Sequence, residues 1–381
     1  MSERIRVMHI IGGLDAGGAE WMLYRLLRAT DRERFAPSVV SLTSGGIVGE
    51  RISEADVPLR TIGLSRGKLP TGGFGRLRHA IRQTKPHVVQ TWMYHSDLFG
   101  GLAAKLSGRV PVAWGVHHTD HDPTTTPRRT LLIVRACTLA SRWLPKRIIC
   151  CSEATRRTHE SLGYPADRMV VIPNGFDTEE FSPSRADRGG FRKSLGLPEG
   201  TALIGMLARY HPQKDHRTLV EAAALLPPEK RDVHFVLCGD GADAGNRDLR
   251  ALLDARAVTE RFHLLGRRDD VPRILASLDL VTSSSSGEAF PLVIGEAMAS
   301  GTPVACTDVG DSRLIVGDAG AIVPPRNPAA LAEAWMGLLN LDGAEKARLA
   351  HVARARIVER FEIHGIAERY ADIHYEVAGP R

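Results

Sequence analysis

The chain has 381 residues, which is enough for two domains of ordinary size, each with its own hydrophobic core. Hydrophobic residues make up 43% of the chain and charged residues 25%, a composition typical of soluble globular proteins. No stretch approaches the ~20 apolar residues that cross a bilayer, and the apolar run near the start is too short for a signal peptide. These features favour a cytoplasmic protein.

The net charge of +6 is unevenly distributed along the chain. Residues 1–178 contain 25 Lys and Arg against 15 Asp and Glu, a balance of +10, whereas the remaining 203 residues contain 25 against 29, a balance of −4. This asymmetry predicts different partners for the two halves. The five cysteines form no C-x-x-C pair and lie mostly in apolar runs, so we expect reduced core residues rather than a zinc site.

A glycine-rich turn follows the first predicted strand, Arg4 to Ile11. It runs from Gly12 to Glu20 and leads into a helix that begins near Ala19. Glycines allow the backbone to approach a ligand closely, and the amino end of the helix favours an anion. The glycines are paired as 12–13 and 17–18, which is not the G-x-G-x-x-G fingerprint of dinucleotide-binding proteins. An NAD-dependent oxidoreductase is therefore disfavoured.

Short apolar runs alternate with helical patterns through the first half of the chain. The predicted strands are Ser38–Leu42, Val88–Thr91, Val112–Val116 and Arg147–Cys151. Such alternation predicts a parallel sheet covered by helices, with ligands bound beyond the carboxyl ends of the strands. Polar or aromatic residues follow three of these ends, at 91–96, 117–122 and 151–153.

The segment from Arg128 to Leu144 predicts a helix with an arginine at every seventh position, at 128, 135 and 142. One interpretation is a core helix with one solvated face. The other is a basic surface that meets anionic lipid headgroups. The segment from Arg66 to Arg78, which also carries Phe and Leu, adds basic charge to the same half of the chain. The sequence leaves both interpretations open.

The second domain is predicted to follow a short strand and an Asn-Gly turn at 170–177. Its first strand is Leu203–Arg209, and a helix begins near Arg217. Arg209 and Lys214 therefore lie at one strand end, five residues apart, where two cations can neutralise the charge of a departing diphosphate. The other predicted strands are Val233–Leu237, Phe262–Leu265, Val304–Thr307, Asp308–Gly310 and Gly320–Val323, and helices are predicted near Pro328 and over Glu359–Glu376.

The stretch from Leu278 to Pro303 carries the most informative pattern. A buried strand, a turn with four serines and a helix from about Pro291 follow one another. The amino end of that helix favours a phosphate-bearing ligand. Glu288 and Glu296 are suited to accept hydrogen bonds from hydroxyl groups, such as those of a sugar and a ribose. A nucleotide sugar has hydroxyl groups on both sides of its diphosphate.

Residues Glu288 to Glu296 resemble the Glu-x7-Glu signature of the retaining glycosyltransferases of family 4. The resemblance implies an α/β fold with two facing Rossmann-like domains and a deep inter-domain cleft, known as GT-B. It implies that the first domain, residues 1–172, binds the acceptor and that the segment 362–381 packs back on it. Phe361, Ile366, Tyr370 and Ile373 would supply the apolar face of this final helix. Residues 173–361 would form the nucleotide-sugar-binding domain, with 170–177 as the hinge.

The resemblance extends to other segments and assigns their residues roles. Gly12–Glu20 is similar to the family's GGxxxGGAE loop, the 238–242 turn to its xxGxGP loop without the Pro, and 266–270 to a loop near the nucleotide base. The implied catalytic residues are Arg209, Lys214, Glu288 and His118. The implied donor-binding residues are Gly17, Gly18, Gly239, Arg268, Phe290, Pro291, Leu292, Val293 and Glu296.

The cluster from His117 to Asp122 could instead bind a metal ion, because its His and Asp side chains are common metal ligands. Asp120-His121-Asp122 also matches the D-x-D motif of the other major glycosyltransferase fold. That fold carries neither Glu-x7-Glu nor two Rossmann units, so we expect no metal and no cofactor. The family's spacing favours His118 over His117 as the residue that reaches the sugar or the acceptor.

The sequence therefore predicts a retaining, metal-independent glycosyltransferase that uses a nucleoside-diphosphate sugar. The acceptor is expected to be a sugar or a lipid-linked molecule in envelope, exopolysaccharide or glycolipid synthesis. Peripheral contact with an anionic membrane at its inner face is one expectation, and no nucleic acid partner is expected. The alternative function is a nucleotide-sugar epimerase on the same fold. A non-catalytic sugar-nucleotide binding protein is disfavoured by the full set of Arg209, Lys214, Glu288 and Glu296.

Overall fold

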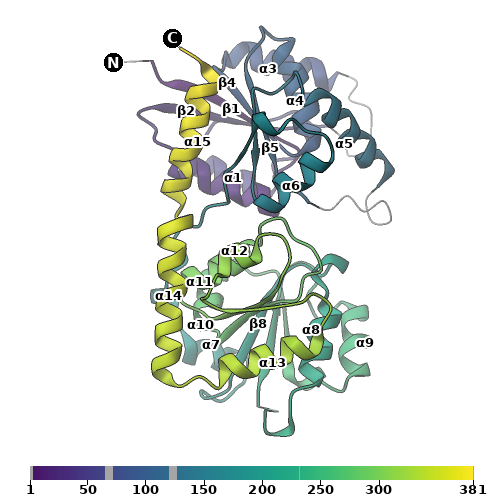
Figure 1. Ribbon diagram of the computed structural model, residues 1–381, viewed down its shortest axis with the longest axis vertical. Coiled ribbons are helices and arrows are strands. Elements are labelled where there is room, and N and C mark those ends of the chain that lie inside the picture. The colour runs from purple at the N-terminus through teal and green to yellow at the C-terminus, as the bar shows by residue number, and fades with distance from the viewer. Residues whose placement is uncertain (1–2, 65–71, 120–126, 231, 381) are drawn as a thin grey trace. The chain divides into compact units, whose positions relative to one another are not determined.

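The computed structural model describes residues 3–64, 72–119, 127–230 and 232–380. The chain divides into two compact units, each of which is a parallel sheet with helices on its faces (Figure 1). Unit 1 comprises Met1–Gly175 and Ile363–Arg381, and unit 2 comprises Phe176–Glu362. None of the helices in the described chain is long and apolar enough to cross a membrane.

In the described part of unit 1, seven strands form a parallel sheet in the order β3-β2-β1-β4-β5-β6-β7. The strands are β1 Ile5–Ile11, β2 Phe35–Ser41, β3 Leu59–Thr61, β4 Val88–Trp92, β5 Val112–Val116, β6 Arg147–Cys150 and β7 Met169–Val171. The helices are α1 Gly18–Ala29, α2 Gly46–Glu54, α3 Gly73–Thr84, α4 Tyr94–Lys105, α5 Arg128–Ala140, α6 Glu153–Ser161 and α15 Ile363–Ala378. The direction of the strand order changes between β1 and β4.

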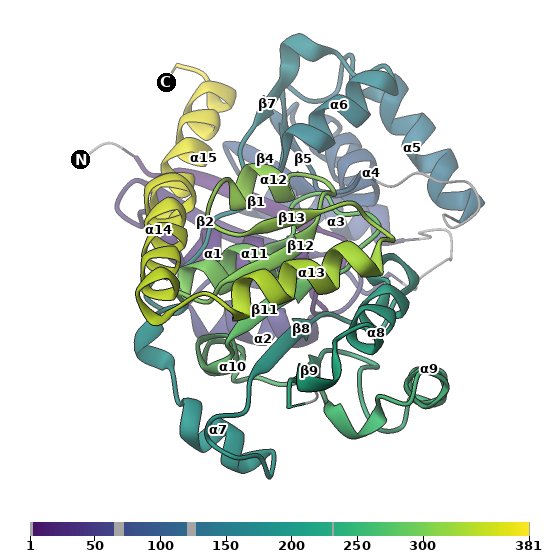
Figure 2. The same cartoon turned by 60° about the horizontal axis from the view of Figure 1, so that its bottom comes forward.

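The described part of unit 2 contains a six-stranded parallel sheet in the order β10-β9-β8-β11-β12-β13 (Figure 2). The strands are β8 Leu203–Leu207, β9 His234–Cys238, β10 Phe262–Gly266, β11 Leu280–Ser283, β12 Val304–Thr307 and β13 Ala321–Val323. The helices are α7 Arg188–Ser194, α8 His216–Ala224, α9 Arg247–Ala255, α10 Val271–Ser277, α11 Leu292–Ala299, α12 Ser312–Val316, α13 Pro328–Leu339 and α14 Gly343–Phe361. Here the direction changes between β8 and β11.

One predicted element is absent from the described structure, and two elements of the structure were not predicted. The predicted strand at Asp308–Gly310 is a turn, because Gly310 has a φ of 57°, outside the range of a strand. The sequence reading missed β3, which has only three residues and little burial. It also missed α14, although Asp342 and Glu345 form a capping box at its amino end.

Helix α15 packs on unit 1 through an apolar stripe that joins one of that unit's core clusters. Ile366, Tyr370 and Ile373 are buried there, as the pattern of the segment predicts. The prediction for Phe361 was wrong, because this residue ends α14 and its ring packs edge-on against Phe176 in unit 2. The terminal segment therefore changes unit at Ile363.

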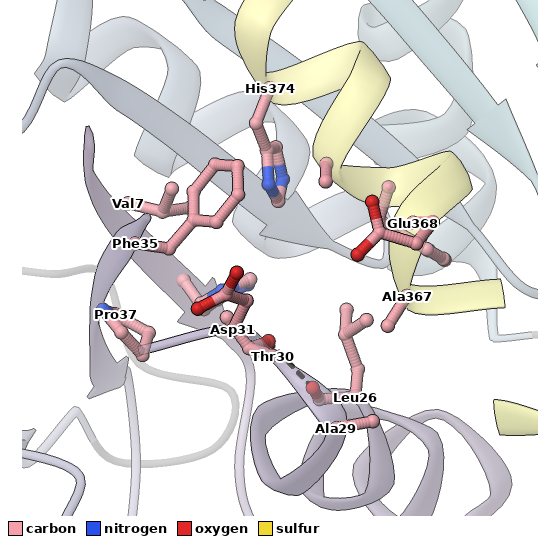
Figure 3. A pocket seen from close by; sticks show the side chains of 13 residues that line it. Val7, Leu26, Ala29, Thr30, Asp31, Phe35, Pro37, Ala367, Glu368 and His374 are labelled. Carbon is pink, nitrogen blue, oxygen red and sulfur yellow. Dashed lines mark hydrogen bonds between the residues drawn. The ribbon is translucent and has the colours of Figure 1, made fainter. Parts of the chain in front are cut away.

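A small cavity of about 20 Å³ lies between α1, β2 and α15, which is room for about one water molecule (Figure 3). His9 and His374 line it, with their ring centroids 5.9 Å apart, and the His374 ring also contacts Phe35. Burial holds the pKa of His9 well below its ordinary value and lowers the pKa of His374 to about 4. Both rings are therefore neutral in the folded protein at neutral pH.

These histidines predict acid-sensitive docking of α15. Their folded-state pKa values lie below the unfolded value near 6.5, so the unfolded state binds more protons and stability falls as pH drops from about 6.5 towards 4. At pH 5 the effect is about 2 kcal/mol for His374. Hydrogen exchange of α15, corrected for the intrinsic rate, should rise between pH 7 and pH 5. The rise should be smaller in His374→Phe, and an equal rise in that variant would contradict the assignment.

Candidate active site

The candidate site of unit 2 lies at the carboxyl ends of β8 and β11. The direction of strand order reverses between these neighbouring strands, and ligands of open α/β sheets bind at such switch points. The loop after β8 carries Arg209 and Lys214, and the loop after β11 carries Glu288. The fold thus brings the two loops together, so that Lys214 meets Glu288 although the two residues are 74 positions apart in the sequence.

Two successive caps define the backbone around Lys214. A single 3-10 turn, Pro212–Lys214, begins at His211, whose side chain accepts a hydrogen bond from the backbone N–H of Gln213. Asp215 then adopts the left-handed conformation, with φ of 48°, and caps α8 by accepting from the backbone and hydroxyl of Thr218. The backbone that carries Lys214 is therefore a hydrogen-bonded turn rather than an irregular loop.

The four serines of the second loop connect it to the Lys214 turn. The Ser284 hydroxyl lies 3.0 Å from the carbonyl of Lys214 and 2.9 Å from that of Asp215, to which it donates. The backbone N–H of Ser286 donates to the carbonyl of Gln213 at 2.8 Å. Because Ser284 is buried, these bonds hold the two loops in one arrangement.

Lys214 and Glu288 form an ion pair at the centre of this site. The Lys214 ammonium donates to Oε1 of Glu288, and the Ser285 hydroxyl donates to the same oxygen at 2.7 Å. The lysine side chain is 22% exposed and the glutamate side chain 14% exposed, so solvent screens the pair only in part. A partly exposed ammonium group in such a position is also accessible to an anionic ligand such as a diphosphate.

The amino end of α11 lies directly after Glu288. Pro291 is its N-cap residue, and within the described chain no side chain caps it, so the first backbone N–H groups at Leu292 and Val293 can face an anion. The loop after β12 also lies close to Glu288. Gly310 permits this approach, because a Cβ there would lie 2.4 Å from the carbonyl oxygen of Glu288. This geometry suits a phosphate group near the glutamate.

The remaining predicted residues of the signature are more buried. Glu296 lies in the second turn of α11 and is 9% exposed. The Phe290 ring is 5% exposed and stacks at 6.1 Å on Phe176, so its side chain belongs to the unit 2 core. Any contact of Phe290 with a donor would therefore be through its backbone.

Gly239 and Arg268 lie at the ends of β9 and β10. Gly239 has φ of 150°, and a Cβ there would lie 2.2 Å from the carbonyl oxygen of Ala208, beside the backbone of Arg209. This glycine thus leaves room for the backbone that leads into Arg209. Arg268 donates two hydrogen bonds of 2.8 Å to Asp270 and lowers the pKa of that carboxyl group. Arg209 itself is exposed at the strand end.

Unit 1 has its own switch point, between β1 and β4, and the glycine turn follows β1 there. Gly17 is the N-cap residue of α1, and a Cβ on it would lie 2.3 Å from the Glu20 carboxylate, which folds over the turn. Gly13 has a packing reason of its own, because a Cβ there would meet the Thr43 hydroxyl at 2.7 Å. Gly18 is the first residue of the helix.

The two histidines after β5 differ in their surroundings. The strand ends at Val116, so His117 and His118 are not held on opposite faces by a continued strand. The His117 ring stacks on Trp92 with centroids 5.0 Å apart, and burial lowers its pKa to about 4. His118 is partly buried and has other contacts. Asp120, His121 and Asp122 lie outside the described residues. The residues that the structure describes contain no cluster of three metal-binding side chains.

The sequence reading missed the residues that support the site. Ser284 and Ser285 were noted only as part of a polar turn, and neither Gln213 nor Gly310 was given a role in the site. The run of four serines directly after a buried strand was the available signal, because buried hydroxyls must find hydrogen-bond partners. Which carbonyl each hydroxyl meets depends on tertiary contacts.

The fold and this geometry define an α/β protein in which the carboxyl edge of the unit 2 sheet is suited to a phosphate-bearing ligand. Two family models match the chain: Glycosyltransferase Family 4 over residues 16–180 and Glycosyl transferases group 1 over residues 201–341. The chain belongs to the family 4, or group 1, retaining glycosyltransferases, and the resemblance found in its sequence is confirmed.

Individual relatives agree with this assignment. The D-inositol 3-phosphate glycosyltransferase of Xylanimonas cellulosilytica is 31% identical, over 92% of this chain and 86% of that protein. The UDP-Gal:alpha-D-GlcNAc-diphosphoundecaprenol alpha-1,3-galactosyltransferase of Escherichia coli is 28% identical, over 62% of this chain and 61% of that protein. The structure of Anabaena HepE in complex with UDP and glucose matches with a TM-score of 0.85 at 24% identity, over 97% of this chain and 99% of that chain, and confirms the GT-B fold.

Replacement of Lys214 by alanine should slow turnover much more than it weakens donor binding. A cation that stabilises the leaving diphosphate acts mainly in the transition state, so the barrier should rise by about 2–4 kcal/mol. Steady-state kinetics of Lys214→Ala against Lys193→Ala, an exposed lysine of α7, measures the difference. A kcat close to that of the control would exclude Lys214 from the chemical step.

Proposed function

We propose that this glycosyltransferase transfers a hexose from a UDP-sugar to a phosphate-bearing, lipid-linked acceptor at the cytoplasmic face of a membrane, in envelope polysaccharide or glycolipid synthesis. The observation that carries the proposal is the Lys214–Glu288 pair beside the amino end of α11. Support for the donor comes from the UDP named with the Anabaena structure and the UDP-Gal named with the Escherichia coli relative.

The residues of unit 2 suit the cleavage of a sugar–phosphate bond. In the proposed step, the bond between the anomeric carbon and the diphosphate oxygen breaks, and the acceptor oxygen bonds to that carbon on the same face. The acceptor proton passes to the leaving diphosphate. Lys214, Arg209 and the backbone N–H groups of Leu292 and Val293 hold the negative charge that develops there.

The two glutamates have positioning roles in this proposal. Glu288 releases Lys214 to the diphosphate and accepts hydrogen bonds from the donor sugar. Glu296, which lies within α11, accepts hydrogen bonds from the ribose. Ser285 keeps its hydrogen bond to Glu288 throughout, so the carboxylate stays oriented after the lysine leaves. The carboxylates are not an acid–nucleophile pair of the glycosidase kind, because the leaving diphosphate takes the proton.

Unit 1 is proposed to bind the acceptor at the carboxyl edge of its sheet. His118 follows a strand at that edge, and so does the turn with Gly17 and Gly18, which is proposed to contact the donor phosphates. The excess of ten positive charges in residues 1–178 suits an anionic acceptor. The names of both curated relatives contain a phosphate-bearing acceptor, inositol 3-phosphate in one and a diphosphate-linked lipid in the other.

A donor screen tests the proposal. UDP-glucose, UDP-galactose, UDP-N-acetylglucosamine and their GDP and ADP counterparts are compared by thermal shift, and those that stabilise the protein are incubated with a polyprenyl-diphosphate sugar. Transfer from a UDP-sugar is expected, and it should survive EDTA because Lys214, Arg209 and backbone N–H groups act in place of a metal ion.

The same reactions without acceptor separate the proposal from its alternative. A nucleotide-sugar epimerase would convert the donor alone, which chromatography of the nucleotide sugar would show. Conversion of the donor without acceptor, or transfer only from a GDP- or ADP-sugar, would contradict the proposal. Loss of transfer in EDTA with recovery in magnesium or manganese would contradict its metal-independent step.

A further inference from the structure

Helix α5 presents leucines to solvent on the same face as its arginines. Leu132 is 62% exposed and Leu139 is 72% exposed, whereas Val134, Cys137 and Ala140 of the opposite face are buried. The exposed face reads Arg128, Leu132, Arg135, Leu139 and Arg142, a spacing of three or four residues that places them in one row. A core helix whose outward face is only solvated would carry polar residues between its arginines.

The exposed row continues beyond the helix. Trp143, in the turn after α5, is 51% exposed, and the Lys105 ammonium lies 4.5 Å from the centre of its ring. Leu106 follows that lysine at the end of α4 and is 54% exposed. Helix α4 packs against α5, and Figures 1 and 2 both show α5 on the outer side of α4.

The charge of this region has one sign. Residues 123–152 contain six Lys and Arg and no Asp or Glu. Lys105 and the exposed Arg109 on the neighbouring segment add to it. The predicted basic segment from Arg66 to Arg78 ends within α3. Residues 65–71 lie outside the described residues.

We propose that the outward face of α5, together with Trp143 and Leu106, binds an anionic lipid bilayer. The leucines and the tryptophan would enter the boundary between headgroups and acyl chains, and the arginine stems would lie along it with their guanidinium groups at the lipid phosphates. The outward face of this helix thus combines exposed apolar side chains with a basic stripe.

Charge decides between this partner and a second copy of the chain. A symmetric dimer would place the same four arginines of α5 and its following turn opposite their equivalents, without a carboxylate from 123 to 152 to neutralise them. An anionic bilayer supplies the neutralising charge and an apolar layer at the same depth. The inference rests on the proposed function for its purpose, which is to bring unit 1 to a lipid-linked acceptor, but binding itself needs neither donor nor acceptor.

The experiment uses the full chain and vesicles of phosphatidylcholine with or without phosphatidylglycerol, at low and high salt. Trp143 is a built-in probe, because Trp92, Trp114 and Trp335 are fully buried and Trp21, in α1, is half-buried. Co-sedimentation with the anionic vesicles at low salt is expected, with quenching of tryptophan fluorescence by lipids brominated on the acyl chains. The quenching should fall sharply in Trp143→Phe while the protein still sediments.

Paired variants separate the apolar and electrostatic contributions. Leu132→Asn with Leu139→Asn should weaken binding roughly tenfold for each leucine, and Arg135→Gln with Arg142→Gln about fivefold for each arginine. Leu225→Asn and Arg250→Gln, at exposed positions of unit 2, are the matched controls and should bind as the wild type does.

Three outcomes would overturn the proposal. They are an absence of binding to anionic vesicles at low salt, binding that the α5 variants leave unchanged, and a dimer in sedimentation velocity that the leucine changes dissociate. Turnover of the α5 variants with a short-chain, water-soluble acceptor is measured in parallel and should equal that of the wild type. Vesicle binding without turnover on any acceptor would contradict the proposed function and support the membrane-binding surface. Turnover without vesicle binding would support the proposed function and contradict the membrane-binding surface.

Discussion

The ion pair between Lys214 and Glu288 is the contact on which the site of unit 2 depends. It exists because β8 and β11 are neighbours at the point where the strand order changes direction, so that their two following loops meet. Buried serine hydroxyls then remove the freedom of both loops: Ser284 binds the carbonyls of the lysine turn, and Ser285 binds the glutamate. The lysine is consequently kept near the place where a diphosphate would sit, with its charge partly neutralised until the diphosphate arrives. A carboxylate that holds the cation in this way lowers the cost of keeping an ammonium group in a partly buried position.

Much of this arrangement could be predicted from the sequence, and the reason lies in its local patterns. Strands such as β5 and β12 begin and end where their apolar runs do, because strands buried on both faces are continuous apolar stretches. The spacing of Glu288 and Glu296 and of Arg209 and Lys214 could be recognised because each pair is carried by one short segment. Contacts between segments could not be predicted. The sequence does not show that Glu288 meets Lys214, that Gly239 keeps space for the backbone of Arg209, or that the Phe290 ring enters the core against Phe176.

Helix α5 shows the same limit in a different form. Its arginine period was evident, but the sequence could not show which face of the helix is buried, because both faces contain apolar residues. Burial of Val134 and Cys137 against the body of unit 1 leaves Leu132 and Leu139 exposed among the arginines. The two units thus differ in character as well as in charge. Unit 2 carries the Lys214–Glu288 pair at one edge of its sheet, and unit 1 carries a basic and apolar surface on α5.

The central claim is that Glu288 competes with the donor diphosphate for Lys214, and calorimetric titration of the free nucleoside diphosphate tests it most directly. This ligand carries no sugar, so the contacts of Glu288 with a donor sugar do not enter the comparison. If the claim is correct, Glu288→Gln binds the nucleoside diphosphate several-fold more tightly than the wild type, because the lysine no longer has a charged partner. The same change made in Lys214→Ala should leave the affinity unaltered. Weaker or unchanged binding by Glu288→Gln in the presence of Lys214 would contradict the account.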